Sequence, residues 1–173
     1  MNVLEYFQDI TTFVFDVDGV LTDGSVLLLE NGLQARKMNV KDGLALQMAI
    51  KNKYNVVIIS GGVSEPVINR LKYLGIDEIH LGIKDKFKFL QLYVEQNNLS
   101  WHEVLYMGDD LPDVPVLELV ALPCCPADAA VEVKKVCKYI SALNGGSGCV
   151  RDVIEKVLKL NDHWNYHTDI SSR

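Results

Sequence analysis

The sequence predicts an α/β fold in which a Rossmann-like parallel sheet carries helices on both faces and a β-hairpin protrudes from it. Short runs of apolar and β-branched residues alternate with amphipathic stretches along the 173 residues, as in repeated β–α units. The strand-like runs are mostly apolar without alternation, which is typical of parallel strands buried on both sides. Apolar residues make up 49% of a chain of ordinary domain length, so a full core can form.

Six runs are expected to form the strands of this sheet. The run NVVIIS at residues 55–60 is the clearest example, because it is continuously apolar up to its final serine. In chain order, the expected strands are residues 12–16, 55–60, 78–81, 104–108, 120–124 and 139–141.

The stretches between these strands are expected to be helices, because apolar residues recur in them three and four positions apart. Residues 150–160 show the cleanest pattern, with Val150, Val153, Ile154 and Val157 on one face. In chain order, the expected helices are residues 42–53, 65–74, 84–97, 112–119, 128–137 and 150–160.

Residues 25–38 interrupt this alternation and are expected to form the hairpin. Asn31-Gly32, a strong signal for a tight turn, lies between two β-like runs. The run from Val26 to Leu29 is apolar on both faces, although a hairpin that projects into water should have one polar face. We therefore expect another subunit to cover this hairpin.

Charge and composition exclude several classes of function. The chain has 17 basic and 23 acidic residues, and its net charge of −6 argues against nucleic acid as the main partner. No apolar run reaches 18 residues and no signal peptide is visible, so no membrane partner is expected. Cys124, Cys125, Cys137 and Cys149 show no metal-binding spacing, and we expect them to be free thiols in the cytoplasm.

Polar side chains follow four successive predicted strands, at the points where the strands end. They are Asp16 and Asp18, then Ser60, which is followed by the free backbone N–H groups of Gly61 and Gly62, then Lys84 and Lys86, and finally Asp109, Asp110 and Asp113. The carboxyl ends of parallel strands meet along one edge of a sheet, so these groups should converge on one crevice. Clustered carboxylates need a compensating cation, and hard oxygen ligands suit Mg²⁺.

Each of these groups has an ordinary structural explanation when it is taken alone. A DxD sequence is often a solvated turn, and Ser-Gly-Gly is a common loop. Lysines at a helix start are often solvated, and Asp110 suits the cap of a helix that Pro112 begins. The conjunction is more specific, because metal ligands, a carboxylate nucleophile, phosphate ligands and a neutralising lysine are what phosphoryl transfer requires.

The four groups in this order resemble the motifs of the haloacid dehalogenase superfamily of phosphatases. The motif DxDGxxT/S appears as DVDGVLT at residues 16–22, and the acidic motif as GDDLPD at residues 108–113. The Ser/Thr motif appears as Ser60-Gly61 and the lysine motif as Lys86. The resemblance covers nearly the whole chain, so we expect a single phosphatase domain at residues 1–160 and a polar C-terminal tail at 161–173.

The resemblance implies a role for most of these residues. Asp16 would be the nucleophile that becomes an aspartyl-phosphate, and Asp18 the general acid and base. Mg²⁺ would be held by the Asp16 side chain, the Asp18 carbonyl and Asp109. Ser60 and Lys86 would bind the phosphoryl oxygens.

Three further residues complete the expected site. Gly61 and Gly62 would contribute to the substrate-binding loop that Ser60 begins. Asp113 would support the metal site, whereas the role of Asp110 is left open.

The spacing of the motifs leaves no room for a cap domain. Only 44 positions separate Asp16 from Ser60, and 26 separate Ser60 from Lys86. The expected hairpin, helices and strand already occupy both intervals, and a cap with its own core needs at least about 40 further residues. We therefore expect a capless phosphatase with an open site.

A narrower resemblance points to the 3-deoxy-D-manno-octulosonate 8-phosphate phosphatases, with motifs DVDGVLTDG, K-x-F-x-x-x-D-G and GGxGAVRE. Here the corresponding stretches read DVDGVLTDG at residues 16–24, KMNVKDG at 37–43 and GGSGCVRD at 145–152. This resemblance implies Mg²⁺-dependent hydrolysis of a small sugar-acid phosphate for lipopolysaccharide precursor synthesis, by a cytoplasmic homotetramer whose hairpins form a shared barrel. Arg151 would bind the substrate carboxylate in the site of an adjacent subunit, because its guanidinium matches a carboxylate.

Several alternatives stay open at this point. Many family members have Ser/Thr-Gly-Arg where this chain has Ser60-Gly61-Gly62, and Met38 stands where Phe is common. A nonulosonate 9-phosphate is therefore the alternative substrate, and a capless site also suits a macromolecule. The order of the acidic groups disfavours a receiver domain, and the presence of both Asp16 and Asp18 disfavours a non-catalytic regulatory domain.

Overall fold

A computed structural model describes residues 3–165 and 170 of the chain. Its centre is a six-stranded sheet in the order β5-β4-β1-β6-β7-β8, and every pairing in it is parallel. The predicted Rossmann-like sheet is therefore confirmed. Its strands are β1 (Thr12–Phe15), β4 (Asn55–Ser60), β5 (Glu78–Leu81), β6 (Val104–Met107), β7 (Leu122–Cys125) and β8 (Tyr139–Ile140).

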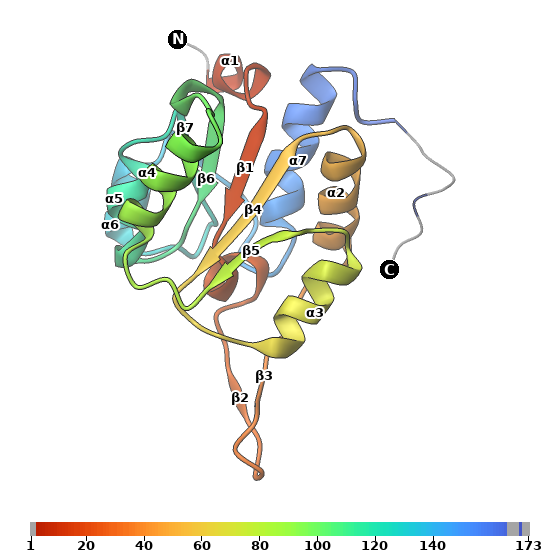
Figure 1. The fold of residues 1–173 in the computed structure, drawn as a ribbon, viewed down its shortest axis with the longest axis vertical. Helices are drawn as coiled ribbons and strands as arrows, with labels where there is room; N and C mark the ends of the chain where they lie inside the picture. Colours follow the sequence, from red (N-terminus) through yellow and green to blue (C-terminus); the bar gives the residue numbers. More distant parts are fainter. Residues whose placement is uncertain (1–2, 166–169, 171–173) are drawn as a thin grey trace.

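Helices cover both faces of the sheet, as expected (Figure 1). One face carries α2 (Val40–Lys51), α3 (Glu65–Tyr73) and α7 (Cys149–Leu160), and the other carries α4 (Lys86–Gln96), α5 (Val114–Leu117) and α6 (Val131–Val136). A further short helix, α1 (Val3–Gln8), was not predicted; it buries Phe7 fully. Within residues 3–165 and 170, no helix is long and apolar enough to cross a membrane.

β1 lies in the middle of the sheet and joins the two halves of the core. Its register aligns Phe15 with Ile58 of β4 on one side and with Met107 of β6 on the other. Phe13 and Phe15 pack into the core beneath α2 and α7, whereas Val14 faces the core beneath α4 and α5. The residue that follows β1 therefore lies at the centre of the carboxyl edge of the sheet.

The predicted hairpin is present but its paired arms are short. β2 (Leu27–Leu28) pairs antiparallel with β3 (Gln34–Ala35), and Thr22 and Met38 form a bridge at its base. The hairpin projects from the edge where the parallel strands end (Figure 1). Leu27 and Leu28 are 63% and 73% exposed in the single chain, which is the unpartnered apolar surface that the sequence pattern predicts.

The start of the C-terminal tail packs against the domain. The Tyr54 hydroxyl lies 2.8 Å from Nδ1 of His163, and the Arg151 guanidinium lies 5.3 Å from the centre of the Trp164 ring. Residues 166–169 and 171–173 of the predicted tail lie outside the described residues. The four cysteines are free, as expected.

α7 belongs to the core rather than to an appendage. Its apolar face, which includes Val150, Val153 and Ile154, is fully buried, and α7 packs along α2. Gly148 at its N-terminus offers no side-chain cap. Instead, Oδ1 of Asp42 on α2 accepts a hydrogen bond of 2.7 Å from the backbone N–H of Arg151. A side chain from a neighbouring helix thus satisfies one of the free N–H groups of the first turn of α7.

Replacement of Asp42 by Asn should make stability less dependent on pH. Asp42 is 1% exposed and Oδ2 has no hydrogen-bond partner among the described residues. Burial raises the pKa of Asp42 from 3.8 to about 6. Between these values the unfolded chain loses its proton and the folded chain keeps it, so the wild type loses stability as pH rises through this window.

The loss should approach about 3 kcal/mol above pH 6, because each pKa unit corresponds to about 1.4 kcal/mol. Urea unfolding of the wild type and Asp42→Asn between pH 4 and pH 8 measures the difference in free energy of unfolding. We expect this difference to move in favour of the variant as pH rises. A difference that is constant with pH would contradict the assignment.

Candidate active site

The predicted site residues meet at the carboxyl edge of the sheet. Asp16 directly follows β1, Ser60 is the last residue of β4, and Asp109 lies just after β6. Lys86 is the first residue of α4, which follows β5. These side chains line one hollow of about 520 Å³, together with Asp18, Gly61, Gly62, Lys84, Asp110 and Asp113 among others. The structure therefore brings together all the predicted site residues except Arg151.

Lys86 is the centre of a buried ion network. Its Nζ lies 2.8 Å from Oδ2 of Asp16 and 2.7 Å from Oδ1 of Asp113, and its side chain is only 5% exposed. Burial disfavours the charged form of Lys86, but the two carboxylates outweigh it and the pKa of Lys86 stays above its usual value. Burial raises the pKa of Asp16 to about 6 although Lys86 lowers it.

Asp113 organises the loop after β6. Its Oδ1 also accepts a 2.6 Å hydrogen bond from the hydroxyl of Tyr106, and its Oδ2 accepts bonds from the backbone N–H groups of Asp109 and Asp110. The position of Gly108 requires glycine, because a Cβ there would lie 2.3 Å from Cγ of Asp113. Asp113 therefore fixes both the ammonium of Lys86 and the backbone that presents Asp109.

The DxDGxxT sequence forms a tight turn that places its two carboxylates. Oδ1 of Asp16 accepts a 2.7 Å hydrogen bond from the N–H of Val17, and Oγ1 of Thr22 accepts bonds from the N–H groups of Gly19 and Gly24. Gly19 has a φ of +86°, and a Cβ there would lie 2.0 Å from Oδ2 of Asp109. Only glycine lets this turn approach Asp109 so closely.

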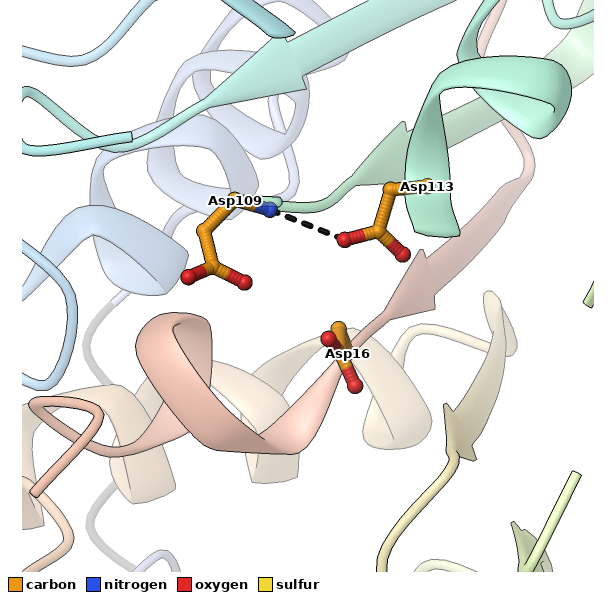
Figure 2. A group of neighbouring side chains, drawn as sticks. All are labelled: Asp16, Asp109 and Asp113. Atoms are coloured by element: carbon orange, nitrogen blue, oxygen red, sulfur yellow. Dashed lines mark hydrogen bonds between the residues drawn. The ribbon is translucent and has the colours of Figure 1, made fainter. Parts of the chain in front are cut away.

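Three carboxylates of the site could hold a metal ion. One oxygen each from Asp16, Asp109 and Asp113 lie within 4.8 Å of one another, and Figure 2 shows the carboxylates around a common space. Burial, followed by the charges of Asp16 and Asp113, raises the pKa of Asp109 to about 7. A bound cation would relieve this repulsion, so the donor set fits a hard divalent ion. Both oxygens of Asp113 already accept hydrogen bonds. Asp113 therefore fits the role of supporting the other metal ligands.

Ser60 and Asp110 have the local roles that their sequence context indicates. Oγ of Ser60, which is 3% exposed, accepts a hydrogen bond of 3.3 Å from the N–H of Gly62 at the edge of the hollow. Asp110 caps the turn of residues 111–113 with a 2.8 Å bond from the N–H of Leu111, and it shares a capping box with Asp113. The capping interpretation of Asp110 is thus confirmed.

Arg36 contacts the site although sequence reasoning missed it. Its Nε lies 2.6 Å from Oδ1 of Asp18, and its Nη2 lies 3.4 Å from Oδ2. The match of K-x-F-x-x-x-D-G to residues 37–43 is one position out of register. Counting back from Asp42-Gly43 places the basic residue at position 36, which is the signal that could have identified Arg36. Lys37 instead lies on the surface with its side chain 78% exposed.

The glycine-rich segment after β8 packs on the DxD turn of its own chain. Gly146 N–H donates to the carbonyl of Val20, and a Cβ at Gly145 would lie 2.0 Å from the carbonyl oxygen of Gly19. Arg151 lies in the first turn of α7, where Nε bonds to Glu155 at 2.9 Å. Arg151 lines a different hollow, beside Lys41 and Lys159, so within its own chain it does not reach the site.

Comparison with known proteins identifies the family. Residues 79–154 match the family model of haloacid dehalogenase-like hydrolases. The chain is 33% identical to the 3-deoxy-D-manno-octulosonate 8-phosphate phosphatase KdsC of Escherichia coli K12 over 157 residues, which cover 91% of this chain and 84% of that protein.

Two solved structures show the same fold over nearly the whole chain. A protein from Pseudomonas syringae that is named a probable YrbI family phosphatase has a TM-score of 0.90 and 35% identity, and the match covers 94% of this chain and 92% of that one. The 3-deoxy-D-manno-octulosonate 8-phosphate phosphatase of Moraxella catarrhalis has a TM-score of 0.90 and 31% identity over 93% of both chains. Its structure contains magnesium, phosphate and the sugar acid 3-deoxy-D-manno-octulosonate (KDO). The chain therefore belongs to the haloacid dehalogenase-like hydrolases, in the family of the 3-deoxy-D-manno-octulosonate 8-phosphate phosphatases.

Proposed function

We propose that this phosphatase hydrolyses 3-deoxy-D-manno-octulosonate 8-phosphate to the free sugar acid and phosphate, with Asp16 as the nucleophile. The observation that carries this proposal is the buried Asp16 carboxylate, which is held by Lys86 at the centre of the sheet edge and lines the site hollow. The names of the relatives and the sugar acid bound to the Moraxella catarrhalis protein support this substrate.

The arrangement supports a two-step reaction. In the first step a carboxylate oxygen of Asp16 attacks phosphorus, the bond from phosphorus to the sugar oxygen breaks, and Asp18 gives that oxygen a proton. In the second step Asp18 takes a proton from water, which attacks the aspartyl-phosphate and releases phosphate. The hydroxyl of Ser60 and the ammonium of Lys86 would bind the phosphoryl oxygens.

The residues also support a magnesium cofactor. The side chains of Asp16 and Asp109 and the backbone carbonyl of Asp18 would hold the ion, while Asp113 supports them through the backbone of the loop. Magnesium would there neutralise charge on the phosphoryl group.

The substrate is tested by phosphate release from a panel of sugar phosphates, with and without Mg²⁺. The panel contains the 8-phosphate of 3-deoxy-D-manno-octulosonate, a nonulosonate 9-phosphate and a phosphopeptide. The highest kcat/KM is expected for the 8-phosphate, and activity should be lost in EDTA. A higher kcat/KM for the 9-phosphate or the phosphopeptide would contradict the proposal and identify that compound as the better substrate.

Asp16→Asn should reduce turnover at least about 10³-fold, because the amide is a poor nucleophile for phosphorus. Phosphate release under saturating Mg²⁺ measures the effect, and circular dichroism checks the fold. Asp77→Asn, which changes an exposed carboxylate, serves as the control and should keep full activity. Substantial Mg²⁺-dependent activity in Asp16→Asn would show that another residue is the nucleophile.

Asp18→Asn should slow the second step more than the first when p-nitrophenyl phosphate is the substrate. Nitrophenolate is a good leaving group that needs little help from a general acid. The attacking water still needs a general base, which typically raises the rate about 10²–10⁴-fold. Stopped-flow absorbance should show a burst of nitrophenolate equal to the enzyme concentration. Equal slowing of both steps, with no burst, would argue against this role.

The exposed hairpin supports a homotetramer. The apolar side chains of Leu27, Leu28, Leu29 and Leu33 lie 42–73% exposed on the projecting arms. Such a patch is stabilised when copies of the hairpin cover one another. In this assembly Arg151 would contact substrate in the site of the adjacent subunit. That role must be tested by substitution, because truncation before α7 would remove part of the core.

Leu27→Glu should convert the tetramer to smaller species, because the interface would have to bury an unpaired charge. Light scattering after gel filtration measures the mass. Val131→Glu is a matched control, because Val131, the first residue of α6, is also 63% exposed but is not part of the hairpin. A wild-type protein of monomer mass, or a tetramer that survives Leu27→Glu, would contradict the proposed interface.

A further inference from the structure

Tyr106 brings a hydroxyl group from the interior of the sheet to the active site. It lies on β6, aligned with Val14 of β1, and its side chain is fully buried. The ring packs in the apolar core that also contains Val57 and Leu90. Phenylalanine would fill that space equally well, so packing alone does not explain the hydroxyl group.

The hydroxyl group of Tyr106 completes the set of donors around Asp113. It donates to Oδ1 of Asp113 at 2.6 Å, and Nζ of Lys86 donates to the same oxygen at 2.7 Å. Oδ2 of Asp113 accepts from the N–H groups of Asp109 and Asp110. A carboxylate has about four lone-pair sites, so these donors use its whole accepting capacity. Burial, followed by the charge of Asp113, raises the pKa of Tyr106 well above its usual value, so the hydroxyl keeps its proton and acts as a donor.

Lys86 has to divide its N–H groups between two carboxylates and the substrate. An ammonium has three donors, and Nζ of Lys86 lies 2.7 Å from Oδ1 of Asp113 and 2.8 Å from Oδ2 of Asp16. In the proposed function Lys86 also binds a phosphoryl oxygen, which needs the third donor. Hydrogen bonds between charged groups are the stronger ones, so an Asp113 oxygen without its second donor would draw another N–H group of Lys86 towards itself. The neutral hydroxyl of Tyr106 fills that place.

We propose that Tyr106 is a positioning residue for phosphoryl transfer, because its hydroxyl saturates Oδ1 of Asp113 and limits Asp113 to one N–H group of Lys86. The other two N–H groups then stay directed at Asp16 and at the phosphoryl oxygen. Tyr106 acts through Asp113 and Lys86 and does not itself contact the reacting atoms. This inference rests on the proposed function for the roles of Asp16 and Lys86, but not on the identity of the sugar.

Tyr106→Phe removes the hydroxyl group and keeps the ring. We expect kcat and kcat/KM to fall together about 10-fold with KM nearly unchanged, because Lys86 is misplaced relative to Asp16 while the contacts to the rest of the substrate remain. The hydrolysis of p-nitrophenyl phosphate and of 3-deoxy-D-manno-octulosonate 8-phosphate should slow by the same factor, since both carry the phosphoryl group. Initial rates over a range of substrate concentrations at saturating Mg²⁺ measure both constants.

Tyr139→Phe is the matched control. The hydroxyl of Tyr139 donates to Oδ2 of Asp152 at 2.7 Å, and the other oxygen of Asp152 contacts the ammonium of Lys156. This second group of a tyrosine, an aspartate and a lysine has the same chemistry, but none of its members lines the site hollow. Tyr139→Phe should therefore leave both kinetic constants unchanged. Circular dichroism of each variant checks the fold.

A double-mutant cycle tests whether Tyr106 acts through Asp113. Asp113→Asn by itself should slow turnover, because Lys86 loses a charged partner. In that background Tyr106→Phe should change kcat less than about twofold, because the oxygen that the hydroxyl saturates no longer holds Lys86 through charge. Equal losses from Tyr106→Phe in both backgrounds would show that the hydroxyl acts independently of Asp113 and would overturn the inference.

The remaining outcomes separate this inference from the proposed function. A wild-type kcat in Tyr106→Phe, or a loss confined to KM, would overturn the inference and leave the proposed substrate in place. A variant that fails to fold would also overturn it, because the hydroxyl would then serve the fold rather than turnover. A loss of about 10-fold in kcat with p-nitrophenyl phosphate, in an enzyme that does not hydrolyse the octulosonate 8-phosphate, would support the inference and contradict the proposed substrate.

Discussion

The buried ammonium of Lys86 holds together two carboxylates that would otherwise repel each other across the edge of the sheet. Asp16 comes from the end of β1 and Asp113 from the turn after β6, and both contact the same Nζ. Removal of one partner from such a buried pair typically costs about 3–5 kcal/mol, because an uncompensated charge remains. The position of Asp16, the proposed nucleophile, therefore depends on a residue that the chain supplies 70 positions later.

The rest of the site is built around this network by close backbone packing. Asp113 also fixes the N–H groups of Asp109 and Asp110, so the same carboxylate that neutralises Lys86 orients the loop that carries Asp109. The turn after Asp16 approaches Asp109 at Gly19, and Gly145 packs against the carbonyl of Gly19 in the same turn. A side chain at either glycine would push the DxD turn away from its partners. The DxD turn is thus held by close contacts of its main chain with the side chain of Asp109 and with the main chain at Gly145.

The hairpin connects the site to the outside of the molecule. Its second arm delivers Arg36 to Asp18, while its first arm exposes the leucines that are proposed to meet other copies. The contact of Arg36 with Asp18 and the proposed contact between copies therefore depend on the same short hairpin. Assembly of the hairpins and the placement of Arg36 are therefore physically linked, because movement of the arm would shift the guanidinium as well as the apolar surface.

Residue patterns along the chain are enough to predict the parallel sheet, its helices and most of the candidate site. Apolar runs identify buried strands, and the carboxyl ends of parallel strands must meet along one edge. The order of the motifs therefore places four side chains in one crevice, those of Asp16, Ser60, Lys86 and Asp109. Such patterns locate a residue only relative to the strand or helix that carries it.

The irregular segments fold back on the site in ways that depend on tertiary packing. Arg36 lies on a hairpin whose direction depends on its base at Thr22 and Met38, not on a local pattern. The segment at Gly145 has the composition of a flexible loop, yet it fits tightly because of a backbone surface formed by residues 19–23. The carboxylate of Asp42 caps a helix that begins more than 100 positions later. These contacts join distant parts of the chain, and their geometry follows from packing rather than from the periodicity of neighbouring residues.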